Sequence, residues 1–345
     1  MEVVDLSSHA SIDQITKFNK KFIPEKRLSE PEFVKWKYRT TNSDGNRITS
    51  HYGLMDKDEI VAQISVQPMR VWLDGSWQQC SYWADWFADP DYSCTGLVLL
   101  SHITAQKPSL LAASASEDAY KIYKFWKFLL MPIDQRFVYI PKPIAAVLAN
   151  RRSPRRAARF FLNWTKKPFA QIPKPRLDDG FQFAEPENVD PGLLEDWESD
   201  APANTIFVRR ETWMFSWLLE KFPFREFKLV VLCCGGQQIG YVLLHVRRND
   251  NGLVEGKIVD LFARGWDHRH LTALFREGSR VLVEMGSHIV RYHATHPLFT
   301  SLAKDNGFTK THNQSVILYG PIAKAMASQP VNLHITYYDH DDAYY

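Results

Sequence analysis

The chain has 345 residues, a formal net charge of +3 and a hydrophobic content of 45%. This length favours two domains of ordinary size, and the composition excludes a disordered chain. The sequence holds no uninterrupted apolar run of about 18 residues and no basic, then apolar, N-terminus, so we expect neither a membrane span nor an export signal. Its four cysteines lack CxxC spacing, which predicts neither a disulfide framework nor a zinc site and favours a cytoplasmic protein.

Positive charge is concentrated in residues 151–176, which hold nine lysines or arginines and no acidic residue. Prolines at 168, 173 and 175 predict a semi-extended linker between an N-terminal domain at 1–150, the first half, and a C-terminal domain at 177–345, the second half. We expect the basic segment to contact tRNA or an anionic surface at the inner face of the membrane, with no role in DNA binding. The arginines concerned are Arg151, Arg152, Arg155, Arg156 and Arg159.

The first half begins with a helical pattern at 29–39, followed by three β-rich runs within 51–88. Lys57–Glu59 and Asp74–Gly75 separate these runs, which predicts an antiparallel meander. We then expect a turn at 89–94 that opens a helix, a strand at 109–115, a helix at 117–129 and a strand near 137–140.

The second half repeats this order of elements. A helical pattern at 209–223 precedes strands within 227–263, which are separated by turns at Gly235–Gly236 and Asn251–Gly252. An amphipathic helix across 271–285, a strand at 287–293, a helix at 297–307 and a strand near 315–319 follow. The repetition predicts a duplicated α/β (α+β) domain, each copy a mixed, mostly antiparallel sheet flanked by helices.

Two segments of the first half have a distinctive spacing of residues. In "DPDYSCTGLVLL", Pro90 and Tyr92 precede a single glycine, Gly96, and "SEDAYKIYKFWKF" places Ala119 and Tyr123 four residues apart. With the order of elements, these segments resemble the Gcn5-related acetyltransferase (GNAT) fold in tandem, as in Fem-type and polysaccharide-associated acyltransferases.

The resemblance implies an acyl-CoA co-substrate, most simply acetyl-CoA, and no metal. It places the CoA pyrophosphate on the turn that opens the first helix after the meander. Of the three glycines usual there only Gly96 is present, and the arginine position holds a serine. The implied binding residues are Ser93, Cys94, Thr95, Gly96, Leu97 and Val98.

The resemblance also implies that Tyr123 protonates the departing CoA thiolate; among so many aromatic neighbours, a core tyrosine is the alternative. Asp85 and Asp260, each on the third strand of a meander, are candidate general bases, as are Glu117 and Asp118. For Asp85 we expect desolvation to raise the pKa, although a strand aspartate is often structural.

Two histidine-containing segments receive simpler interpretations. His293 and His296 have a spacing that could suit a metal or a base, but no third ligand follows, so we expect capping or surface histidines. The run Asp267–His270, "DHRH", is expected to be a solvated turn.

Together these observations predict an acyltransferase that transfers an acyl group from acyl-CoA, bound by the first half, to an amine or hydroxyl of a larger acceptor. A sugar nucleotide or a lipid-linked glycan of polysaccharide biosynthesis is the expected acceptor, held between the halves. Two alternatives remain open: an aminoacyl-tRNA-dependent transferase of the Fem type, and a non-catalytic binding protein that kept the duplicated fold.

Overall fold

The structure is a computed structural model of the whole chain. It describes residues 1–23, 27–42, 44–113, 115–150, 172–202, 204–328 and 331–339, and five isolated positions between 151 and 171. Four of the five linker arginines, Arg151, Arg152, Arg156 and Arg159, lie outside the described residues.

The first half follows the expected order of elements. The meander consists of β2 (Ser50–Asp56), β3 (Glu59–Leu73) and β4 (Ser76–Ala88), with turns where the sequence predicts them. After it come α4 (Thr95–Gln106), β5 (Leu110–Ala113), α5 (Glu117–Phe125) and β6 (Leu129–Tyr139). The elements before and after are β1 (Val3–Asp5), α1 (Leu6–His9), α2 (Ile12–Phe22), η1 (Arg27–Ser29), α3 (Pro31–Arg39) and α6 (Pro143–Ala149).

The second half repeats this order, as expected. Its meander consists of β9 (Phe227–Cys234), β10 (Gln237–Arg248) and β11 (Val254–Ala263), followed by η2 (Arg264–Trp266), α10 (His268–Glu284), β12 (Ile289–Ala294), α11 (Pro297–Asp305) and β13 (Thr309–Tyr319). The run "DHRH" therefore opens a helix, and the expectation of a solvated turn is wrong. The remaining elements are β7 (Phe181–Ala184), α8 (Pro191–Asp200), β8 (Thr205–Val208), α9 (Thr212–Leu219), α12 (Pro321–Ser328), β14 (Asn332–His334) and η3 (Tyr337–Asp339).

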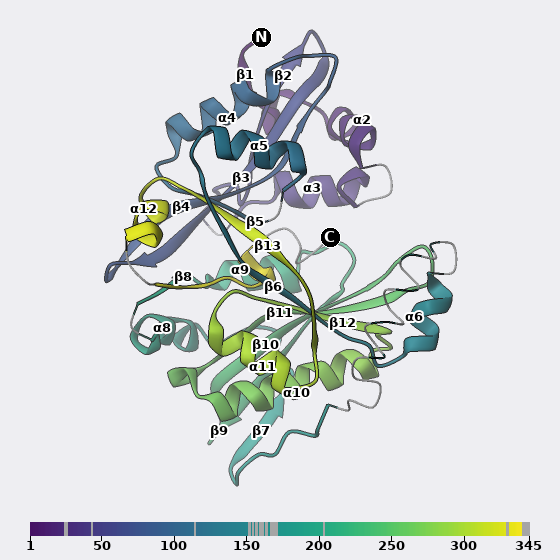
Figure 1. Cartoon of the computed structure of the whole chain (residues 1–345), viewed down its shortest axis with the longest axis vertical. Helices are drawn as coiled ribbons and strands as arrows, with labels where there is room; N and C mark the ends of the chain where they lie inside the picture. Colours follow the sequence, from purple (N-terminus) through teal and green to yellow (C-terminus); the bar gives the residue numbers. More distant parts are fainter. Residues whose placement is uncertain are drawn as a thin grey trace.

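The two halves exchange one strand each. Within the described residues, the strands form one continuous mixed sheet in the order β1-β2-β3-β4-β5-β13-β6-β12-β11-β10-β9-β7, with β8 and β14 attached through β3. Strand β13 of the second half lies between β5 and β6, and β6 lies between β12 and β13. Figure 1 shows these two long strands running between the upper group of elements, which includes α2 to α5, and the lower group around α10 and α11. The two halves, which are already joined through the chain, are therefore also joined by the hydrogen bonds of a shared sheet.

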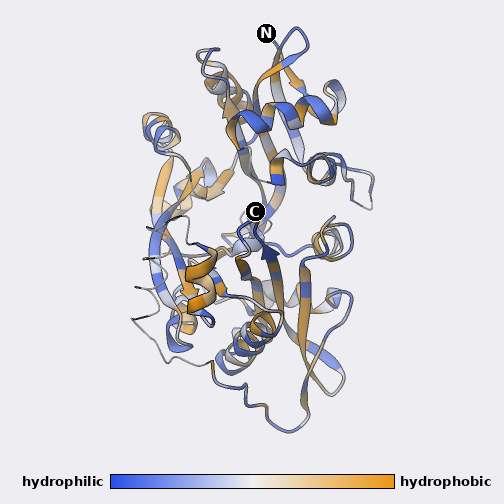
Figure 2. Ribbon diagram, turned by 90° about the vertical axis from the view of Figure 1, so that its right-hand side faces the viewer, coloured by the Kyte–Doolittle hydropathy of each residue, from blue (hydrophilic) through white to orange (hydrophobic). Residues whose placement is uncertain are grey.

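The N-terminal helices also pack against the second half. The indole of Trp36 on α3 stacks on that of Trp217 on α9, with ring centroids 4.0 Å apart. Arg27 on η1 forms two hydrogen bonds to the carboxylate of Glu226, at 2.5 and 2.6 Å. Figure 2 shows hydrophobic strands in both groups of elements and hydrophilic loops around them. A single large hydrophobic cluster includes buried residues of both halves.

Helix α10 illustrates how the sequence determines this packing. Asp267 caps its first turn, and the buried residues Leu271, Leu274 and Leu282 recur on the face that lies against β10 and β11. A Cβ added at Gly278 would come within 3.0 Å of a methyl group of Val242. The glycine therefore permits the close approach of helix and sheet.

Candidate functional site

The strands β4 and β5 separate in the middle of the first half. They pair in parallel only at Ser81–Leu110 and Tyr82–Leu111, and beyond these positions each continues without the other. The register between β3 and β4 shifts in this region, and Asp85 has a φ of 52°. A bulge of this kind interrupts the ladder and leaves main-chain groups available for other partners.

Asp85 lies at this bulge, but it is not a free carboxylate. Its Oδ2 accepts hydrogen bonds from Tyr38 and Ser65, both at 2.7 Å, and lies 2.6 Å from Nζ of Lys37. Burial alone would raise the pKa of Asp85, but the Lys37 ammonium and the hydrogen bonds outweigh it and lower the pKa. The expectation of a raised pKa is wrong, because the sequence did not reveal that Lys37 would be buried beside it.

Tyr123 lies on α5 in an aromatic cluster. Its ring stacks on that of Trp83 at 5.2 Å between centroids and lies 5.8 Å from that of Trp86, and burial raises its pKa. The neighbouring candidates Glu117 and Asp118 are exposed at the start of the same helix, where Asp118 pairs with Lys121. The role of Tyr123 as an acid stays a prediction.

The turn before α4 leaves its backbone donors without a side-chain cap. Cys94, the N-cap residue, has a φ of 67° and forms no side-chain capping hydrogen bond. Ser93 and Cys94 are exposed, and Val98 is 47% exposed. The first amides of a helix have no intrahelical partners, so this turn can accept an anion.

Gly96 has a packing role in the same turn. A Cβ at this position would lie 3.2 Å from Nε1 of Trp86 and from Cβ of Ala88, and Trp86 donates a hydrogen bond to the Gly96 carbonyl at 3.0 Å. Any side chain here would therefore separate α4 from the end of β4.

Acidic groups lie around this turn. Asp89 accepts a hydrogen bond from the amide of Asp91 and pairs with Lys21 at 2.9 Å, and Tyr92 donates to the carboxylate of Asp56. The side-chain hydrogen bond from Lys21 is the main cause that lowers the pKa of Asp89. An incoming phosphate thus encounters donors from the helix and negative charge from the loop.

The second half contains an equivalent separation of strands. β11 and β12 pair in parallel from Glu255–Ile289 to Ile258–Tyr292, and Asp260 lies two residues beyond Ile258, where β11 pairs only with β10. Arg210 binds Asp260 through two hydrogen bonds of 2.8 Å, and Tyr241 donates a third at 2.6 Å. Like Asp85, Asp260 is held by a buried cation, here a guanidinium that also pairs with Asp339.

The C-terminal segment occupies this second gap. Thr336 donates a hydrogen bond to Asp260 at 2.8 Å, and the amide of Ile335 donates to the hydroxyl of Thr295, which follows β12. His334 is fully buried and lies edge-on to Trp266, at 5.2 Å between ring centroids. Residues 332–339 therefore fill the space between the diverging ends of β11 and β12.

The helix start of the second half is also occupied. Asp267 accepts hydrogen bonds from the amides of Arg269 and His270, both at 2.9 Å. The amide of Gly265 donates to the carboxylate of Asp200 at 2.6 Å. Two side-chain carboxylates thus take the donors that an anion would need at this turn.

His293 is buried, so the expectation of a surface or capping residue is wrong for it. Its Nε2 lies 2.7 Å from Oδ1 of Asp134 on β6, and Arg136 holds the same carboxylate. The exchange of β6 creates this cluster, which no local pattern reveals. His296 does cap a helix, because its ring nitrogen accepts a hydrogen bond from the amide of Leu298.

The described residues offer little for metal binding or for a membrane span. No group of three or more potential metal ligands occurs among the described residues. No helix of the described chain is both long and apolar enough to cross a membrane. Arg155 is exposed, and Ile144 and Leu148 on α6, just before the basic segment, are 75% and 62% exposed. Contact with an anionic surface stays a prediction.

The site reasoning missed Lys37 and Arg210, the cations that hold the two strand aspartates. The sequence offered a signal for Lys37, because this lysine lies between two large aromatic residues, Trp36 and Tyr38. Both aromatic residues are buried in the structure. Arg210 offered no such signal, since it precedes α9 within a mixed run of charges.

Neither family models nor curated proteins match the sequence. Solved structures of similar fold include the following three. A GCN5-related N-acetyltransferase from Anabaena variabilis ATCC 29413 has a TM-score of 0.58 at 13% identity, over 92% of this chain and 72% of that one. Saccharomyces cerevisiae N-myristoyltransferase with bound myristoyl-CoA has a TM-score of 0.59 at 11% identity, over 92% of this chain and 82% of that one.

A conserved protein from Enterococcus faecalis V583, described as a probable N-acyltransferase, has a TM-score of 0.56 at 13% identity, over 92% of this chain and 71% of that one. All three similarities extend over both halves, and at this identity they are similarities of fold. The resemblance to Fem-type enzymes stays a prediction. The chain therefore has the GNAT fold, with its elements present twice.

Proposed function

We propose that the protein is an acyltransferase that binds acyl-CoA in its first half and transfers the acyl group to an amine or hydroxyl. The observation that carries this proposal is the difference between the two helix starts. The α4 turn has no side-chain cap, whereas Asp200 and Asp267 occupy the donors before and within α10. Similar structures that bind or transfer acyl groups support the proposal through their shared fold.

In the proposed reaction the pyrophosphate of CoA lies on the α4 turn and the thioester lies between the separating β4 and β5. Main-chain N–H groups beside the bulge at Asp85 stabilise the oxygen of the thioester carbonyl as it becomes negative. The acceptor attacks the carbonyl carbon and loses a proton, the carbon–sulfur bond breaks, and Tyr123 gives its proton to the thiolate. Solvent then restores the proton of Tyr123.

Asp85 is better suited to fix the bulge than to act as a base. Lys37, Tyr38 and Ser65 all bind the same carboxylate oxygen, and the lowered pKa makes Asp85 a weak proton acceptor. Its interactions tie α3 and β3 to the bulge, so it positions the main chain there. We assign the removal of the acceptor proton to a water molecule or to a basic group beside the bound acceptor.

For the acceptor we propose a sugar nucleotide or a lipid-linked glycan, bound where the N-terminal helices meet the second half. Charged side chains support a polar ligand there. Glu255 and Arg291 form a pair with an Nε–Oε1 distance of 2.6 Å, and their side chains remain 17% and 31% exposed. Arg27 and Glu226 form a second pair nearby in the same group of charges.

A substitution at Val98 tests the donor site. Val98→Glu adds a carboxylate in the first turn of α4, which suits the helix dipole but repels a phosphate. We expect the thermal shift produced by acetyl-CoA to disappear in this variant, while its melting temperature without ligand stays unchanged or rises. The neutral control Val98→Gln should keep the shift. A wild-type protein that no acyl-CoA stabilises would contradict the proposal.

The second candidate function is a binding protein without catalysis. Asp89 and Asp91 at the α4 turn favour it, because they oppose a phosphate there. In that case neither acetyl-CoA nor longer acyl-CoAs would raise the melting temperature. A shift with tRNA alone would instead favour the aminoacyl-tRNA-dependent alternative.

A further inference from the structure

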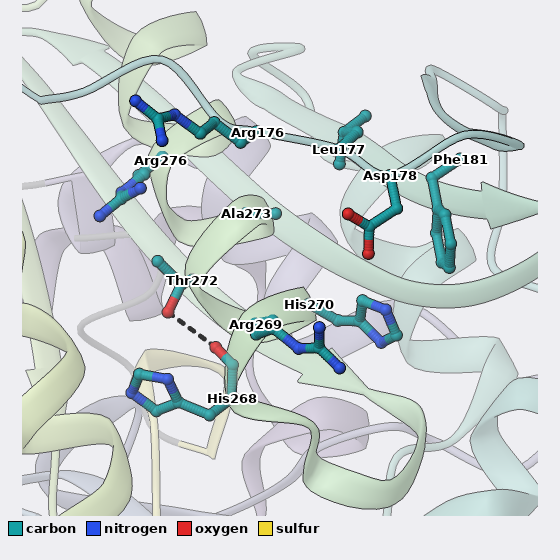
Figure 3. A pocket seen from close by; sticks show the side chains of 10 residues that line it. All are labelled: Arg176, Leu177, Asp178, Phe181, His268, Arg269, His270, Thr272, Ala273 and Arg276. Atoms are coloured by element: carbon teal, nitrogen blue, oxygen red, sulfur yellow. Dashed lines mark hydrogen bonds between the residues drawn. The ribbon is translucent and has the colours of Figure 1, made fainter.

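A basic pocket lies on the outer side of α10, in the lower group of elements in Figure 1, whereas the α4 turn belongs to the upper group. Figure 3 shows the ten side chains that line it, from α10 and from the segment that leads into β7. Its volume is about 340 Å³, which is at the lower end of the range typical of small-molecule sites. The lining residues are Arg176, Leu177, Asp178, Phe181, His268, Arg269, His270, Thr272, Ala273 and Arg276.

The charge of this lining is unbalanced. Three arginines and two histidines face one aspartate. Among the described residues, no carboxylate forms an ion pair with Arg176, Arg269 or Arg276, and Arg276 donates its hydrogen bond to the neutral amide oxygen of Asn306 at 2.7 Å. By contrast, Arg280 one turn further along α10 pairs with Glu277 and Glu284. The lining therefore carries a net positive charge that attracts an anion, although Asp178 belongs to it and Asp267 lies 3.6 Å from Nδ1 of His270.

The walls of the pocket are held in place. Leu177 and Phe181 pack against the main hydrophobic cluster, and β7 pairs with β9, which fixes the segment that crosses α10. Phe181 also contacts the ring of His270, with centroids 5.1 Å apart. In Figure 3, Arg176 and Arg276 lie on one side of the pocket, while Phe181 and His270 lie on the other. Arg176 and Arg276 thus form one end of the pocket, and the two rings form the other end together with Arg269 and Asp178.

We propose that this pocket binds a small phosphate ester that carries a ring, such as a nucleotide or a sugar phosphate. Arg176 and Arg276 hold the phosphate, and the ring packs against Phe181 at the other end of the pocket. The amides of the α10 start take no part, because Asp267 and Asp200 occupy them. The site is separate from the donor turn of the first half and does not depend on it.

Calorimetric titration of the full chain with ADP, glucose 1-phosphate and inorganic pyrophosphate tests this proposal. We expect at least one ring-bearing ester to bind more tightly than pyrophosphate. Arg176→Gln and Arg276→Gln should each weaken its binding about tenfold or more, as the loss of one charge-assisted hydrogen bond implies. Phe181→Leu should weaken the binding of the ring-bearing ester and leave the affinity for pyrophosphate unchanged.

Arg248→Gln is the matched control. Arg248 is an exposed arginine at the far end of β10, where it pairs in register with Val254. Its substitution removes the same charge at a position away from the pocket. No binding of any probe to the wild-type protein, or an equal loss in Arg248→Gln, would overturn the proposal. Arg176 lies outside helices and strands, so Arg176→Gln remains decisive should Arg276→Gln disturb α10. Binding that survives Arg176→Gln would locate the ligand elsewhere, for example at the α4 turn.

Discussion

The two strand separations, one in each half, share a plan and differ in what fills them. In both, an aspartate on the third meander strand is held by a buried cation, Lys37 for Asp85 and Arg210 for Asp260. In the second half, residues 332–339 and two carboxylates occupy the gap and the helix start, whereas the α4 turn carries no such cap. A duplicated fold can thus keep its supporting ion pairs in both copies while the helix start after the meander is capped by side chains in only one of them.

The largest effect is expected where the second gap is closed. Arg210→Leu leaves Asp260 and Asp339 buried without their shared cation, and burial already raises the pKa of Asp339 to about 6. We expect the free energy of unfolding to fall by about 3–5 kcal/mol, measured by urea denaturation. Arg209→Leu changes a partly exposed neighbour and should cost about 1 kcal/mol or less. Equal losses in both variants would show that Arg210 does not hold this region.

The corresponding change in the first half is Lys37→Met, which should cost about 3 kcal/mol at pH 7. In the wild-type protein the lowered pKa of Asp85 contributes stability above the pKa of the unfolded state, and this contribution is lost as the pH falls through the folded pKa. Without Lys37 the pKa of Asp85 rises, so the deficit of the variant should shrink toward pH 4. Denaturation across this pH range measures it.

Lys35→Met is the control, because Lys35 is exposed on the same helix. Its effect on stability should be small and independent of pH. A deficit in Lys37→Met that does not change with pH would argue that packing, rather than the charge of Asp85, explains the loss.

Tyr123→Phe sharpens the comparison by testing activity in the first half. Removal of a general acid should lower the rate of acyl transfer by about 100-fold, while the thermal shift with acetyl-CoA and the overall stability remain nearly unchanged. Tyr120→Phe, on the same helix, should keep full activity. Equal rates in the two variants would reject the acid role and leave Tyr123 as a core residue.

The sequence allowed most elements to be predicted, but not the path of β6. The strand was expected near 137–140, whereas it covers Leu129–Tyr139, because Pro132 and the continuous apolar residues Leu129–Met131 obscure its alternation. Its partners are β12 and β13, both far along the chain. A strand stabilised by such distant pairing has only a weak local pattern.

The candidate site divides in the same way. The α4 turn and the start of the helix follow from the local run of residues 89–98, as predicted. The environment of Asp85 and His293 does not, since Lys37 and Asp134 reach them only through tertiary packing. The pKa of a buried group depends on such neighbours, which is why the expected direction for Asp85 was wrong.

By itself the sequence determined the duplicated order of elements, because the alternation of strands and the amphipathic period of helices such as α10 are local properties. Only the tertiary structure decided that β6 and β13 change places, that residues 332–339 close the second gap, and that Arg176 and Arg276 face one pocket. These features depend on contacts between residues far apart in the chain, where the gain from burying and pairing groups outweighs any local preference.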